Sequence, residues 1–208
     1  MNEQVTSTAP RKPRYRWRVV DIVVAALIAV TGGVIFWLWS LGAGPVGVLT
    51  AAYPPLAGLY SGGWVIPAVL GALIIRKPGA AFFCETVGAM GELLMGSKYG
   101  VAVMVSGMIQ GLGAELIFAA FGYRKFTLTV ALLAGGAAGL FMGLNDTIAP
   151  WGWNIAWALD HKIVYILCCV VGCAILAGVL SWLAARGLSR TGALSAFPSR
   201  NAASEPVL

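Results

Sequence analysis

Carboxyl and amide side chains stand inside long apolar runs of this sequence, where a polar group needs a reason. Glu85 and Glu92 are seven residues apart, so a helix would carry both on one face. Gln110 lies in the middle of the next apolar run, and Asn145 and Asp146 end a later one. A polar side chain at membrane depth is costly, and among these residues we predict that Glu92, Gln110, Asn145 and Asp146 contact a ligand. These groups suit a small ligand that carries hydrogen-bond donors or a positive charge.

Aromatic side chains accompany these polar groups in the sequence. Trp64, Trp151 and Trp153 are candidates to stack on a ligand ring. Tryptophans also form an interfacial belt in any membrane protein, and Asp146 could equally cap a helix end that faces water. Glu92 is better explained by a ligand or an internal polar network than by simple solvation. We therefore predict a pocket in the outer half of the protein.

Two further acidic residues are explained without a ligand. Glu115 lies two to three helical turns from Tyr123 and Arg124, which favours a structural hydrogen bond or ion pair at least as strongly as a substrate contact. Asp21 can pair with Arg18, three residues earlier on the same helix face.

The positions of the basic residues predict how the chain crosses a membrane. Of the 208 residues 59% are hydrophobic and 11% are charged, about half the charged share of a soluble domain. Twelve of the 14 lysines and arginines fall in clusters that flank alternate gaps between the apolar runs: Arg11, Lys12, Arg14, Arg16, Arg18, Arg76, Lys77, Arg124, Lys125, Arg186, Arg190 and Arg200. This is the positive-inside pattern of a polytopic membrane protein with both ends in the cytoplasm. The net charge of +6 therefore indicates anionic lipid as a partner, and no nucleic acid.

The apolar runs predict an all-α integral membrane protein with six transmembrane helices. The spans are expected at 18–41, 64–75, 78–95, 100–121, 128–148 and 163–185. Two prolines and a Ser-Gly-Gly sequence interrupt the stretch before residue 64, so residues 44–60 are predicted to form an extracellular loop with room for a half-helix. The predicted organisation is a disordered basic cytoplasmic tail (1–16), a six-helix domain (17–188) and a second cytoplasmic tail (189–208).

Several signatures of catalysis are absent from the sequence. It holds no P-loop, no G-x-S-x-G, no H-E-x-x-H and a single histidine. Its four cysteines lie inside apolar runs and are interpreted as packing residues. We therefore expect no enzyme activity, no cofactor and no metal site.

Three blocks of the sequence resemble the YkoE family. They are residues 17–25 (WRVVDIVVA), 75–81 (IRKPGAA) and 110–118 (QGLGAELIF), the last followed by Tyr123 and Arg124. The family comprises bacterial cell-membrane substrate-binding (S) components of energy-coupling-factor ABC transporters, associated with thiamine or its hydroxymethylpyrimidine precursor. The resemblance implies a six-helix S component with a vitamin pocket toward the outside and the 44–60 loop as its lid.

The resemblance also implies partners. Ala25, Ala29 and Gly33 recur every four residues, a stripe that alone usually serves internal packing. In the family an Ala-x-x-x-Ala face of the first helix docks on a transmembrane coupling subunit, which two ATP-binding subunits energise. The resemblance assigns this role to Ala25 and Ala29, and the stripe extends to Gly33.

The expected substrate site follows from the pocket and the implied ligand together. Glu92 would take the charge of the aminopyrimidine or thiazolium, and Gln110 would hydrogen-bond the ring. Asn145 or Asp146 would add a polar contact. The alternatives are an S component for another vitamin or for a metal ion such as cobalt, and a membrane scaffold subunit that transports nothing.

Overall fold

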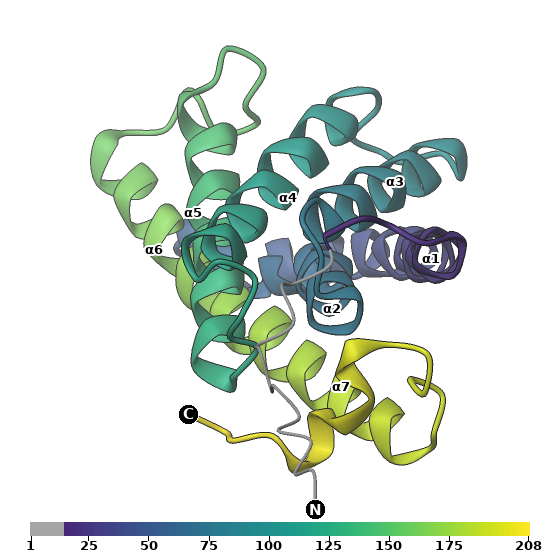
Figure 1. The fold of residues 1–208 in the computed structure, drawn as a ribbon. Coiled ribbons are helices and arrows are strands. Elements are labelled where there is room, and N and C mark those ends of the chain that lie inside the picture. The colour runs from purple at the N-terminus through teal and green to yellow at the C-terminus, as the bar shows by residue number, and fades with distance from the viewer. Residues whose placement is uncertain (1–14) are drawn as a thin grey trace, which may run out of the picture.

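Long apolar runs with few charges form the helices of this protein, seen in a computed structural model that describes residues 15–208 (Figure 1). Within that range no strand occurs. The α-helices are α1 (Val19–Leu49), α2 (Ile66–Ile75), α3 (Ala80–Leu94), α4 (Ala102–Ala120), α5 (Leu128–Ile148), α6 (Leu159–Cys173) and α7 (Leu180–Arg190). Two 3₁₀ segments, η1 (Pro54–Val65) and η3 (Pro198–Ser204), and one π segment, η2 (Ala174–Val179), complete the order.

Several of these segments join into longer helices. The 3₁₀ segment η1 continues directly into α2, and α6, η2 and α7 follow one another without a break. Five helices are long and apolar enough to cross a membrane: Val19–Leu49, Pro54–Ile75, Ala102–Ala120, Leu128–Ile148 and Leu159–Arg190. The 15-residue α3, which carries Glu85 and Glu92, is shorter than the roughly 20 residues that a bilayer core needs. The count of six spans and the orientation of the termini stay predictions.

The chain after the first span differs from the prediction. Residues 44–60 do not form a loop, because α1 continues through Pro45 to Leu49 and η1 begins at Pro54. Pro54 and Pro55 lie in the first turn of η1, where proline is tolerated because its missing N–H would have no intrahelical partner. A side chain at Gly62 would meet the α6 backbone, since its Cβ would lie 2.6 Å from the Gly172 carbonyl oxygen. Gly58 and Gly62, from the stretch that was expected to interrupt the helices, instead allow η1 to pack closely on α6.

The stripe of small residues on α1 faces the interior of the bundle. Ala25 and Ala29 are fully buried, and a Cβ at Gly33 would lie 3.0 Å from both the Gly88 carbonyl oxygen and the Gly91 Cα of α3. The role of these three residues in docking a partner stays a prediction, although they are buried in this structure. They bring α1 and α3 into backbone contact, which small residues permit in membrane helices.

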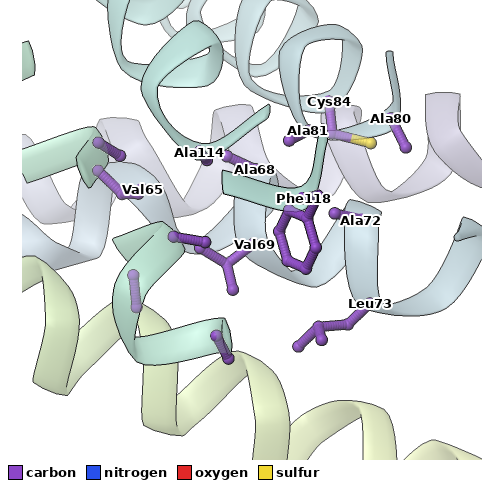
Figure 2. Close-up of a cluster of buried hydrophobic side chains, with 14 of the residues drawn as sticks. Val65, Ala68, Val69, Ala72, Leu73, Ala80, Ala81, Cys84, Ala114 and Phe118 are labelled. Atoms are coloured by element: carbon purple, nitrogen blue, oxygen red, sulfur yellow. The ribbon is translucent and has the colours of Figure 1, made fainter. Parts of the chain in front are cut away.

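The hydrophobic core surrounds α2, of whose ten residues eight are buried. Figure 2 shows the Phe118 ring of α4 beside Val69 and Ala72 of α2. The thiol of Cys84 lies in the same cluster and contacts the carbonyl oxygen of Ala25 at 3.6 Å. All four cysteines are free thiols.

The side chain of Glu115, on α4, caps the N-terminus of the neighbouring helix α3. Its carboxylate accepts hydrogen bonds from the backbone N–H groups of Gly79 (2.6 Å), Ala81 (2.9 Å) and Phe82 (3.3 Å). The hydroxyl of Tyr123 donates a fourth bond at 2.7 Å. Burial and this carboxylate raise the pKa of Tyr123 well above its ordinary value. The expectation of a structural hydrogen bond for Glu115 is confirmed.

A buried ion-pair network lies at the same end of the bundle. The Asp21 carboxylate pairs with Arg18 at 2.8 Å, as the sequence predicted, and also with Lys77 of the α2–α3 turn. Lys77 donates a further bond to the Arg16 carbonyl oxygen at 2.9 Å. The network fixes the start of α1 to the start of α3. Residues 1–14 of the predicted tail lie outside the described residues.

The last part of the chain folds back on the bundle as a C-terminal strap, defined here as residues 191–207 (yellow in Figure 1). Its Leu194 and Phe197 are buried, and the Ser199 hydroxyl donates to the Ile74 carbonyl oxygen of α2 at 2.7 Å. The segment predicted as a tail therefore packs against α2 and α7.

One ion pair joins the strap to the α2–α3 turn. Both carboxylate oxygens of Glu205 accept from the Arg76 guanidinium at 2.6 Å. The same guanidinium lies 4.6 Å above the ring centroid of Phe126. Arg186 of α7 donates to the carbonyl oxygens of Ala203 and Glu205.

Candidate functional site

A cavity of about 350 Å³ lies at the end of the bundle opposite the strap, which falls within the range of roughly 300–1,000 Å³ typical of small-ligand sites. Its walls come from the last turns of α1, from η1, α3, α4 and α5, and from the loop between α5 and α6. Five of the seven residues predicted to contact the substrate line it: Trp64, Glu92, Gln110, Asp146 and Trp153.

Glu92 is fully buried in the wall formed by α3. Its Oε1 accepts from the hydroxyls of Ser40 at 2.7 Å and Ser97 at 3.1 Å. The Ser40 hydroxyl also accepts from the indole N–H of Trp64 at 3.1 Å, so this ring is tied to the carboxylate through one serine. Glu92 Oε2 has no hydrogen-bond partner within residues 15–208.

Glu85 lies two turns deeper on the same face of α3 and is also fully buried. Its Oε2 accepts from the backbone N–H of Ala68 at 3.0 Å, and its Oε1 has no partner in the described part of the chain. Gly111 of α4 makes room for it, because a Cβ there would lie 2.9 Å from the Glu85 Cβ. The predicted site omitted Glu85, although its seven-residue spacing from Glu92 was the available signal.

Gln110 lines the deep part of the cavity from α4. Its side-chain amide donates to the Ser106 hydroxyl, one turn earlier, at 2.6 Å. Both residues are nearly fully buried and line the cavity. The bond uses a donor of Gln110 and leaves its amide oxygen as an acceptor.

Asp146 is positioned by three neighbours, of which Tyr165 lines the cavity and Asn145 and Trp151 do not. Asn145 donates its amide to Asp146 Oδ1 at 3.0 Å, and the Trp151 indole donates to Asn145 Oδ1 at 2.9 Å. The Tyr165 hydroxyl donates to Asp146 Oδ2 at 2.9 Å. Of the predicted contact residues, Asn145 and the half-exposed Trp151 therefore orient Asp146 rather than face the cavity.

Aromatic rings form a connected row along the cavity. Trp39 and Tyr60 stack with centroids 4.4 Å apart, and Tyr60 meets the edge of Trp64 at 5.8 Å. Tyr99 links Trp64 at 6.2 Å to Trp153 at 5.1 Å. Burial, followed by the nearby carboxylates, raises the pKa of Tyr99 to about 12, so its hydroxyl is neutral at physiological pH. The tyrosines carried no signal in the sequence, because isolated aromatic residues are common in membrane helices.

Two carboxylate oxygens of the residues that line this cavity, Glu85 Oε1 and Glu92 Oε2, are buried without a hydrogen-bond partner among residues 15–208. The donors of Trp64, Tyr60 and Tyr165 and one amide donor of Gln110 are already engaged. The arrangement therefore suits a flat ligand that brings its own hydrogen-bond donors or a positive charge. Within residues 15–208 no group of three or more His, Cys, Asp or Glu side chains could hold a metal ion.

Known proteins are similar to this chain in sequence and in fold. Residues 20–141 match the family described as "ABC-type cobalt transport system, permease component". The chain is 32% identical over 183 residues to the "Putative HMP/thiamine permease protein YkoE" of Bacillus subtilis (strain 168), covering 86% of this chain and 88% of that protein. A crystal structure described as an S-component of an ECF transporter matches with a TM-score of 0.79 and 30% identity, over 88% of this chain and 91% of the other. The chain is therefore a multi-pass bacterial cell-membrane protein that belongs to the YkoE family of energy-coupling-factor transporter S components.

Proposed function

We propose that the cavity binds thiamine or its hydroxymethylpyrimidine precursor for import. The observation that carries this proposal is the buried Oε2 of Glu92, which has no hydrogen-bond partner within residues 15–208 and lies next to the rings of Trp64 and Tyr99. A carboxylate beside aromatic faces suits an amino-bearing or cationic ring. The name of the Bacillus subtilis relative, an HMP/thiamine permease, supports the same ligand class.

Each lining residue has a role in this proposal. Glu92 accepts from the ligand, Gln110 hydrogen-bonds a ring atom, and Trp64 and Trp153 contact the ring faces. Stacking of a cationic ring on tryptophan contributes about 2 kcal/mol where water is excluded. Asp146 adds a polar contact whose orientation Asn145 and Trp151 maintain.

Transport would require partners that this chain does not contain. In the proposal a transmembrane coupling subunit contacts this protein, and two ATP-binding subunits hydrolyse ATP. Release of the ligand follows only if the partners bind one conformation of the S component better than another. Since Ala25 and Ala29 are buried against α3, the coupling subunit would contact other residues unless α1 moves.

A cobalt ion is disfavoured as the transported substrate by the donors in the cavity. Cobalt needs several His, Cys or carboxylate ligands close together. Glu85 and Glu92 are two helical turns apart on α3, and Asp146 is held by Asn145 and Tyr165 on the other side. These carboxylates are spaced for separate contacts with an organic ligand.

Ligand titration of the detergent-purified protein tests the proposal. We expect thiamine or hydroxymethylpyrimidine to quench tryptophan fluorescence saturably, because Trp64, Trp153 and Trp157 line the cavity. Glu92→Gln should weaken binding by about tenfold or more, since a charge-assisted hydrogen bond is lost. Asp160→Asn removes an exposed carboxylate outside the cavity and is the matched control.

Two outcomes contradict the proposal. A folded protein that binds neither compound would favour a scaffold role or another substrate. A Glu92→Gln variant that changes the affinity by less than about twofold would remove Glu92 from the site.

A further inference from the structure

We propose that Glu85 and Glu92 define two subsites and select a two-ended ligand, with an amino-bearing ring at Glu85 and a cationic ring at Glu92. This inference rests on the proposed function and deepens it. It assigns a binding role to Glu85 and an orientation to the ligand.

The carboxylates of Glu85 and Glu92 are alike in burial, in position on the cavity wall and in hydrogen bonding. Each is fully buried, each lines the same cavity, and each has one oxygen engaged by the protein and one without a partner among the described residues. A buried polar atom left unpaired costs free energy, so both oxygens call for donors from a ligand. Their seven-residue separation on α3 places the two backbone positions about 10 Å apart. Two rings joined by a single carbon suit this separation better than one ring.

The deep subsite at Glu85 offers hydrogen-bond acceptors where α3 and α4 pack closely. The contact between the two helices depends on Gly107, since a Cβ there would lie 2.5 Å from the Ala89 Cβ. The free oxygen of Glu85 and the amide oxygen of Gln110 both accept hydrogen bonds. An amino group on a flat ring supplies two donors for these acceptors.

The outer subsite at Glu92 combines a carboxylate with ring faces. Tyr99 and Trp64 flank it, and the free Oε2 of Glu92 remains for a positive charge. Lys98 lies at the rim, but its Nζ is 5.0 Å from the Tyr99 ring centroid, and no ion pair within residues 15–208 joins it to Glu92. A delocalised cationic ring is therefore favoured here over a second amino-bearing ring.

Thiamine has this two-ended chemistry, since one carbon joins its aminopyrimidine to a cationic thiazolium. Hydroxymethylpyrimidine supplies only the first end. In the wild-type protein we therefore expect thiamine to bind at least about tenfold more tightly than hydroxymethylpyrimidine, because only thiamine satisfies both carboxylates.

Oxythiamine tests the orientation, because it differs from thiamine by a carbonyl oxygen in place of the amino group. Both compounds are titrated into the full-length wild type, Glu85→Gln, Glu92→Gln and the control Asp160→Asn. The wild type and the control should prefer thiamine by about tenfold or more. Glu85→Gln should largely remove this preference, because a glutamine amide can donate to the carbonyl of oxythiamine. Glu92→Gln should lower the affinity for both compounds by similar factors and keep the preference for thiamine.

The outcomes separate the two proposals. If thiamine binds but Glu85→Gln keeps the full preference, the subsite assignment is overturned and the proposed function stands. If Glu92→Gln is the variant that removes the preference, the ligand lies in the opposite orientation and the inference is overturned. If the folded wild type binds neither compound, both proposals fail. Should Glu85→Gln not fold, equal wild-type affinity for thiamine and oxythiamine would still overturn the inference.

Discussion

Single carboxylates in this protein have clearly different surroundings, and those surroundings separate structural from ligand-binding roles. Glu115 receives four hydrogen bonds from the chain, three of them from the N-terminal turn of α3. Glu85 and Glu92 each keep one oxygen unengaged within the part of the chain that the structure describes. A carboxylate with saturated acceptors stabilises the fold, whereas an unsaturated one in a cavity has capacity for a ligand.

Glu115→Gln tests the structural role. The amide keeps one acceptor oxygen but turns an NH₂ group toward backbone donors, so we expect a loss of about 1–3 kcal/mol in the free energy of unfolding. A thiol-reactive dye can report unfolding in detergent, because Cys84, Cys169 and Cys173 are buried in the folded state. Tyr123→Phe removes only one of the bonds and should cost about 1 kcal/mol. Equal stability of Glu115→Gln and the wild type would contradict this role.

The candidate site could be predicted in part at this scale. Glu92, Gln110 and Asp146 stood out because polar residues are rare in apolar runs. Glu85 had the same signal, but its contact with the cavity depends on the narrow space beside Gly111, which only packing reveals. The roles of Tyr60 and Tyr99 likewise come from tertiary contacts.

At the scale of helices, small residues decide which pairs lie close together. The spans corresponding to α4 and α5 were predicted within a few residues, because their apolar runs have clear ends. The stretch 44–60 was not, since a Pro-Pro and a Ser-Gly-Gly sequence usually mark a loop. Here Gly58 contacts α6 and Gly63, just after this stretch, contacts Trp39, and such long-range packing overrides the local signal.

Gly33→Ala tests the contact between α1 and α3. The new methyl group would meet backbone atoms of Gly88 and Gly91 at 3.0 Å, and backbone cannot move aside as a flexible side chain does. We expect a loss of about 1–3 kcal/mol in the free energy of unfolding. Gly44→Ala on the same helix is the control, because no atom of residues 15–208 lies within 4 Å of its new Cβ, apart from its chain neighbours and the backbone of its own helix. It should be neutral or stabilising by up to about 1 kcal/mol. If the two variants have the same free energy of unfolding, α1 and α3 are less tightly packed than described.

Across the whole molecule, the cavity and the C-terminal strap lie at opposite ends of the bundle. The Arg76–Glu205 pair and the buried Phe197 hold the strap on α2 and α7. Asp21 and Lys77 fix α1 at the same end. The fixed end therefore supports helices whose other ends surround the cavity.

Glu205→Gln tests this separation. Loss of the two-point contact with Arg76 should lower the free energy of unfolding by about 1–3 kcal/mol, because that guanidinium is left mostly buried without its anion. Ligand affinity, measured well below the unfolding temperature, should stay that of the wild type. A weakened affinity without lost stability would mean that the strap communicates with the cavity.

The π segment Ala174–Val179 makes the packing of the following residues depend on the number of residues in the last long helix. The buried residues of the last long helix recur at steps of four: Tyr165, Cys169, Cys173, Ala177, Ser181 and Ala185. In a regular α-helix each such step rotates the buried face by about 40°. The wider π turn absorbs part of this rotation and keeps both halves of the helix facing inward. Deleting Ala177 would therefore shift the phase of everything after it by about 100°. The hydrogen bond from Ser181 to the Ile66 carbonyl oxygen would be lost. One residue of length thus determines whether the end of this chain can reach its place on the bundle.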